Sequence, residues 1–120
     1  MNSMPKQRYV EELLRLYGGL AHTPARPSRH DRQLAADLYE RQVPYERAEA
    51  ALLLASARRL MRPETAPALG PIRSLHYFLP VIEELGGAEV SADYIRYLRG
   101  RIMTLEQRGQ LGLRKSSSTA

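Results

Sequence analysis

The sequence predicts an all-α protein, a compact bundle of about five helices around one central apolar helix. Apolar residues recur at helical spacing in segments that proline and glycine separate. No segment has the alternation of a half-buried strand. A chain of 120 residues has room for one domain. We therefore expect a single helical domain over residues 1–109 and a disordered basic, serine-rich tail over residues 110–120.

The first helix is expected over residues 5–20, where apolar positions follow the helical period and charges take the other face. Ser3 is its expected cap, because a serine hydroxyl can accept a hydrogen bond from a free amide of the first turn. Pro5 suits that first turn, where a helix tolerates proline. Gly18 and Gly19 are expected to end the helix.

A stiff, extended linker over residues 22–27 contains two prolines and leads to the second helix. Ser28 and Asp31 have the three-residue separation of a capping box, in which each side chain binds the other residue's backbone amide. The helix should end near Arg41, because Pro44 disfavours a helical conformation in the residue before it.

The third helix, expected over residues 44–61, is the predicted centre of the core. It is apolar almost all round between Ala48 and Leu60. A helix without a polar face is normally surrounded by other elements. Its girth could also be buried partly against a second copy of the chain, so a homo-oligomer is one hypothesis for its partners.

A proline-rich loop over residues 62–71 precedes the fourth segment, residues 72–85. Pro80 lies inside this segment, where proline removes a helical hydrogen bond and clashes with the preceding turn. We therefore expect a kink or two short helices. Gly86 and Gly87 should terminate the segment.

The chain has a formal net charge of +5, nearly all of it from arginine. The planar guanidinium group suits phosphate and can stack on bases, which indicates nucleic acid. A GC-rich genome, whose codons favour arginine over lysine, would give the same composition.

The absence of cysteine excludes disulfides and thiolate metal sites. With no long apolar run and no signal-peptide pattern, we expect a cytoplasmic protein without a membrane span.

Nothing in the sequence has the spacing of a catalytic or metal-binding motif, so we expect no enzyme activity, metal or cofactor. The chain contains three histidines, His22, His30 and His76. Glu83 and Glu84 are adjacent, so they point to different faces of a helix. An enzyme would become the better reading if His76, Glu83 and Arg73 faced one cleft.

Arginines at the end of the third helix are the first candidate nucleic-acid contacts. Arg58 and Arg62 share a face, and Arg59 lies between them in the sequence. Arg73 and His76 open the fourth segment, so all these groups would gather at one end if the two helices were antiparallel neighbours. Cations at a helix C-terminus are also favoured by the helix dipole, which leaves a structural role open.

The last helix should begin at a Ser91 cap and run to about Arg108, with Gly109 as its stop. Its apolar stripe leaves Tyr97, Arg101 and Arg108 on the other face. A tyrosine beside an arginine can stack on an unpaired base while the arginine holds phosphate. It can equally anchor a protein partner or cover a neighbouring helix.

Residues 30–85 contain a short helix, a turn, an apolar helix, a proline-rich loop and the segment "PIRSLHYFLPVIEEL". This stretch resembles the C-terminal helical region of DnaD-like replication-initiation proteins of bacteria, plasmids and phages. The residues that match the family's pattern are Ser74, Leu75, Tyr77, Phe78 and Ile82. The resemblance implies DNA binding and remodelling of an initiator complex.

The leading hypothesis is therefore a non-enzymatic DNA-associated protein of replication or mobile-element maintenance. It would contact phosphate through arginine and could dock a larger protein of a replication or transposition complex. The candidate contacts are Arg58, Arg59, Arg62, Arg73, Tyr97 and Arg101. The alternative is a helical adaptor that binds only protein partners.

Overall fold

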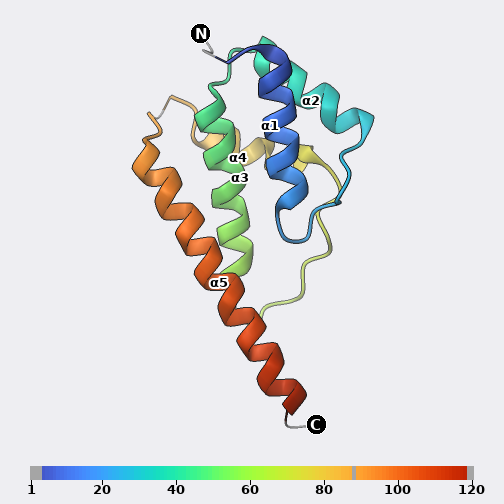
Figure 1. Cartoon of the computed structure of the whole chain (residues 1–120), viewed down its shortest axis with the longest axis vertical. Helices are drawn as coiled ribbons and strands as arrows, with labels where there is room; N and C mark the ends of the chain where they lie inside the picture. The colour runs from blue at the N-terminus through green and yellow to red at the C-terminus, as the bar shows by residue number, and fades with distance from the viewer. Residues whose placement is uncertain (1–3, 88, 119–120) are drawn as a thin grey trace.

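The computed structural model describes residues 4–87 and 89–118, with side chains to residue 109. These residues form five α-helices and one short 3-10 helix and contain no strand (Figure 1). The elements are α1 (Lys6–Gly19), α2 (Arg29–Glu40), α3 (Tyr45–Leu60), the 3-10 helix η1 (Leu75–Phe78), α4 (Leu79–Glu84) and α5 (Ala92–Ser118). The predicted all-α bundle is confirmed.

Helix α3 is the centre of the bundle, as its apolar girth predicts. Its buried residues run from Tyr45 to Ala57 and contribute to two clusters of the core. One cluster joins α3 to α1, α2, η1 and α4, and the other joins α3 to α5. Small alanines such as Ala50 and Ala57 face α5 and are almost fully buried. A single chain thus covers α3, and a second copy is not needed to bury this helix.

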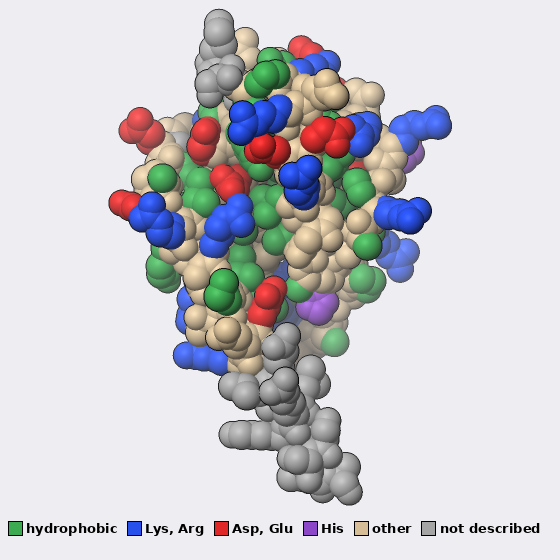
Figure 2. Space-filling model, viewed as in Figure 1, with side chains coloured by type: hydrophobic (Ala, Val, Ile, Leu, Met, Phe, Trp, Pro, Cys, Tyr) green, Lys and Arg blue, Asp and Glu red, His purple; other side chains and the backbone are tan. Residues whose placement is uncertain are grey.

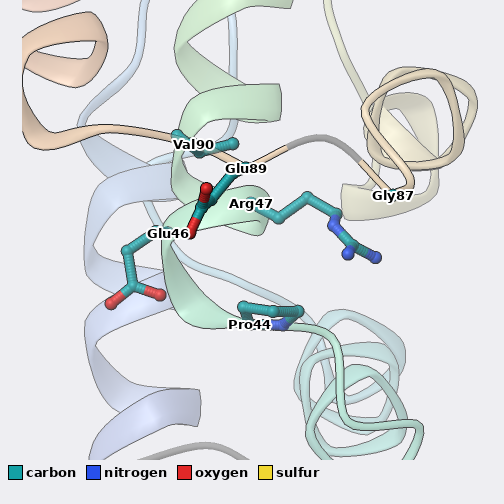
Figure 3. Close-up of a pocket in the computed structure, with 6 residues that line it drawn as sticks. All are labelled: Pro44, Glu46, Arg47, Gly87, Glu89 and Val90. Carbon is teal, nitrogen blue, oxygen red and sulfur yellow. The ribbon is translucent and has the colours of Figure 1, made fainter.

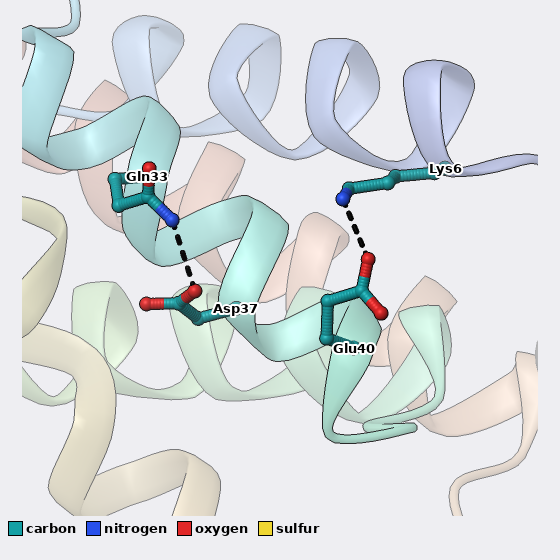
Figure 4. A network of polar contacts seen from close by, with 4 residues as sticks. All are labelled: Lys6, Gln33, Asp37 and Glu40. Atoms are coloured by element: carbon teal, nitrogen blue, oxygen red, sulfur yellow. Dashed lines mark hydrogen bonds and ion pairs between the residues drawn. The ribbon is translucent and has the colours of Figure 1, made fainter.

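Helices α1 and α2 pack side by side and begin in different ways. Helix α1 starts after Pro5, without a side-chain cap, and the predicted cap Ser3 lies outside the described residues. An ion pair between Lys6 and Glu40 connects the start of α1 with the end of α2 (Figure 4). The pair is exposed at both ends, so we assign it an orienting role rather than a large share of stability.

The predicted capping box of α2 is present in both directions. The Asp31 amide donates to Ser28 Oγ at 3.1 Å, and the Ser28 amide donates to Asp31 Oδ2 at 2.8 Å. The other carboxylate oxygen, Oδ1, accepts a hydrogen bond of 2.9 Å from the backbone amide of Leu75. Asp31 is 1% exposed, so one buried carboxylate both caps α2 and fixes the start of η1.

Pro80 divides the fourth segment into two short helices, as predicted. The 3-10 turns of η1 end at Phe78, and Pro80 lies within the first two positions of α4, where its missing amide costs no helical hydrogen bond. Leu75 and Phe78 are fully buried. The segment stops at Gly86 and Gly87, and Gly87 takes the left-handed conformation with a φ of 83°.

Helix α5 begins as predicted, because Ser91 Oγ accepts a hydrogen bond of 3.1 Å from the Tyr94 amide. The predicted stop at Gly109 is wrong, since α5 continues to Ser118. A glycine ends a helix when it adopts a positive φ, and Gly109 does not. The helix therefore crosses into the predicted tail, while the division into a domain and a tail stays a prediction.

Helices α3 and α5 run in the same direction, and the lower half of α5 projects past the rest of the molecule (Figure 1). The principal extents of 53 × 31 × 23 Å express this elongation. Among the described helices, none is both long and apolar enough to cross a membrane.

Candidate nucleic-acid interface

Three of the predicted contacts come together at the end of α3. Arg58, Arg59 and Arg62 line one open hollow of about 270 Å³, together with Leu69 and Tyr77. The structure therefore joins the α3 arginines as the sequence predicts. It also shows that each of them already makes internal contacts, which decides how much each could offer to a phosphate.

Arg58 is paired with a carboxylate. Its two terminal nitrogens donate to the two carboxylate oxygens of Glu84 at 2.9 and 2.6 Å, so the pair is bidentate. The hydrogen bond from Arg58 lowers the pKa of Glu84, and the same bond raises the pKa of Arg58. A phosphate would have to displace Glu84, so Arg58 is a weaker candidate than its exposure suggests.

Arg59 holds the proline-rich loop against the bundle. Its guanidinium lies 5.4 Å from the centre of the Tyr77 ring and donates to the Tyr77 hydroxyl at 3.2 Å. Its other terminal nitrogen donates to the carbonyl oxygen of Gly70 at 2.8 Å. The sequence analysis did not connect Arg59 with Tyr77, because the contact depends on how the loop returns to α3.

Arg62 has a similar role one turn later. It donates to the carbonyl oxygen of Pro67 at 2.8 Å and remains exposed. Arg59 and Arg62 also line a second hollow of about 260 Å³ on the loop side, with His22. The His22 backbone has a positive φ of 69°, and its carbonyl accepts a hydrogen bond of 2.8 Å from the Ile72 amide. This end of the molecule is therefore cationic but internally bonded.

Arg73 stands apart from the α3 arginines in its contacts. It is exposed, and within the described residues it makes no ion pair or side-chain hydrogen bond. Two residues later, the Leu75 amide is bonded to Asp31. The segment that follows Arg73 is therefore tied to the start of α2. No hydrogen bond or ion pair among the described residues joins Arg73 to Arg58 or Arg62, so the expected gathering of these groups stays a prediction.

The candidates on α5 differ from each other in exposure. Tyr97 is 62% exposed, so it does not cover a neighbouring helix. Arg101, one turn further on, is half-buried, and its guanidinium lies 4.0 Å from the sulfur of Met61 at the end of α3. Arg101 therefore borders the α3 surface instead of pointing fully away from it. Its guanidinium has no acidic partner among the described residues.

Most of the net charge of the chain lies on α5. Residues 92–118 contain six basic and two acidic residues, so they account for +4 of the total of +5. Among the described side chains of the helix, Ile102 is the last that is strongly buried, and Arg108 is exposed. Arg108 belongs with the candidates, and the charge balance of the last helix is the sequence signal that points to it.

The described cavities give no clear catalytic constellation. The hollow in Figure 3, of about 480 Å³, is lined by Glu46, Arg47 and Glu89 among others. The Arg47 guanidinium extends away from both carboxylates (Figure 3). His76, Glu83 and Arg73 are all exposed, and none of them lines this hollow or the two hollows beside the α3 arginines. The condition that would favour an enzyme is therefore not met in these hollows.

No family model, curated protein or solved structure gives a significant match to this chain. The resemblance to DnaD-like proteins therefore stays an expectation from the sequence. Of the residues that carry it, Leu75, Phe78 and Ile82 are buried in the core, whereas Tyr77 is 42% exposed. The matching pattern is thus mainly a pattern of core packing.

Proposed function

We propose that the protein is a non-enzymatic DNA-binding protein in which α5 makes the principal contacts to phosphate. The observation that carries this proposal is the charge of α5. This helix holds +4 of the net charge of +5, and it extends beyond the body of the molecule. A helix that projects from a protein can approach a nucleic-acid backbone without a clash from the rest of the fold. Arginine then supplies phosphate contacts that are independent of base sequence.

The internal contacts rank the candidate residues. Arg58 is neutralised by Glu84, and Arg59 and Arg62 hold backbone carbonyls of the loop. Arg101 and Arg108 have no acidic partner among the described side chains, so a phosphate displaces no carboxylate there. We therefore assign the main contacts to α5, with Arg62 and Arg73 as secondary contacts.

Tyr97 suits a role beside these arginines. Its ring is exposed on α5, one turn before Arg101. An exposed aromatic ring next to a cation can stack on an unpaired base, which would favour single-stranded DNA over duplex. A place in replication or mobile-element maintenance rests on the DnaD-like resemblance alone.

Fluorescence anisotropy with labelled single-stranded and duplex oligonucleotides tests the proposal. The logarithm of the binding constant should fall linearly with the logarithm of salt concentration. Arg101→Ala and Arg108→Ala should each reduce the steepness of that fall, by about 0.9 for duplex or about 0.7 for a single strand per lost contact. Arg58→Ala is the matched control, because it removes the same charge from a guanidinium that Glu84 already holds.

The proposal fails if the protein binds neither form of DNA at low salt. It also fails if both α5 variants retain the salt dependence of the unchanged protein. If the protein binds neither form of DNA, the hypothesis of a helical adaptor is favoured. A pull-down of a defined protein partner that is unaffected by nuclease would support that hypothesis.

A further inference from the structure

A groove lies between α1 and α5, and Tyr45, Glu49 and Leu53 of α3 also line it. It consists of two adjoining hollows of about 440 and 340 Å³, which share Arg15, Leu16 and Arg99 as lining residues. We call it the α1–α5 groove. Figure 2 shows apolar side chains in this central region, with charged side chains on both sides.

Both walls of the α1–α5 groove contain apolar side chains, and one wall carries an exposed methionine. Leu16 of α1 and Leu20, directly after this helix, are half-buried, and Ile102 of α5 lines the same hollow. Met103 also lines it and is 62% exposed. A recess and an exposed methionine therefore lie on the same face. Methionine is unbranched and adapts to irregular recesses, so Met103 is suited to enter a hollow of this kind.

The free charges of the groove are opposite in sign and lie on opposite walls. Arg15 on α1 and Glu106 on α5 form no ion pair among the residues described. The remaining charges are already matched: Arg99 with Glu49 at 2.6 Å, and Glu12 with Arg8 at 2.9 Å. The groove thus offers one unmatched cation and one unmatched anion.

We propose that the α1–α5 groove binds a second copy of this chain across a two-fold axis. In a two-fold interface the same surface meets itself, so each feature must find its complement on the same face. Met103 of each copy would enter the groove of the other, and Arg15 of each would meet Glu106 of the other. The dimer does not depend on DNA binding, and it would present two copies of the basic helix α5.

We test the dimer by sedimentation velocity and light scattering of the full chain at protein concentrations from about 1 μM to about 1 mM. A small interface is expected to have a dissociation constant within that range of concentrations. The mass should double as concentration rises. Met103→Glu should stay monomeric, with a dissociation constant raised at least tenfold. Met61→Glu is the matched control, since Met61 is also an exposed methionine, at 47%, but lies outside the groove. Circular dichroism should show that both variants fold.

The charge pair allows a sharper test. Arg15→Glu and Glu106→Arg should each weaken self-association, because each leaves like charges facing across the axis. Mixed together, the two variants should form a dimer, since every facing pair is then opposite in sign. The proposal is overturned if the unchanged protein is monomeric throughout the range, if Met103→Glu dimerises normally, or if the mixture does not associate.

Discussion

Asp31→Ala tests whether one buried carboxylate holds two parts of the fold together. The change removes the carboxylate half of the capping box, so the Ser28 amide loses its acceptor, a hydrogen bond worth about 1 kcal/mol. It also leaves the Leu75 amide without its acceptor in a buried position, which costs about 1–3 kcal/mol. We expect a total loss of about 2–4 kcal/mol in the free energy of unfolding, a large share of the roughly 5–15 kcal/mol of a typical domain.

Urea unfolding followed by far-UV circular dichroism measures this loss. Ser28→Ala is the informative comparison, because it removes one hydrogen bond of the capping box and leaves the bond to Leu75 intact. It should cost only about 1 kcal/mol. Asp37→Ala, on the same helix, removes only an exposed hydrogen bond from Gln33 and should change stability by about 0.5 kcal/mol or less. If Asp31→Ala costs no more than Ser28→Ala, the link to η1 contributes nothing and the reasoning is refuted.

Three further predictions concern two glycines and the buried tyrosines. Gly87→Ala should lower the melting temperature, because a side chain at a φ of 83° costs about 1–2 kcal/mol. Gly109→Ala should instead increase the helical circular dichroism signal, because alanine favours a helix more than glycine does and no atom would lie within 4 Å of the new Cβ. A loss of stability in Gly109→Ala would contradict this expectation. Burial raises the pKa of Tyr17 and of Tyr45 to about 12, against about 10 in the unfolded chain. The folded state therefore keeps these protons longer, and stability should be intact below pH about 10 and fall as the pH rises towards 12. The part of the tyrosinate absorbance that belongs to the buried tyrosines should appear together with unfolding, whereas ionisation of all tyrosines near pH 10 in a folded protein would disprove the prediction.

The sequence predicted those parts of the fold that depend on local signals. The capping box of Ser28 and Asp31 is a short-range pattern, and both of its hydrogen bonds are present. Pro80 breaks the fourth segment because its ring and missing amide act within one turn. The central position of α3 followed from its composition, since apolar residues on all sides require neighbours on all sides.

The sequence could not predict contacts between distant segments. Asp31 binds the Leu75 amide across 44 positions, and no local pattern marks an acceptor for that amide. In the same way, the carbonyl of Gly70 becomes a partner of Arg59 only when the loop folds back. The stop at Gly109 failed for a different reason: glycine weakens a helix by about 1 kcal/mol but does not oblige it to end.

The candidate site shows the same division. Clustering of Arg58, Arg59 and Arg62 followed from helical spacing, and they do share a hollow. Their loss of availability did not follow, because Glu84 lies on another helix and the loop carbonyls belong to an irregular segment. The sequence alone therefore predicts where the cationic side chains cluster. The groups that they bind can be identified only from the tertiary structure.

The buried side chains form two clusters that meet at α3, and only the smaller one includes α5. Since Ile95, Leu98 and Ile102 supply the buried contacts of α5, we expect this helix to separate from α3 while the larger cluster stays packed. Such opening requires less free energy than global unfolding. On this view α5 and the rest of the bundle unfold as two separate cooperative units. We therefore expect the amides of the helix that carries most of the positive charge to exchange with solvent through partial opening.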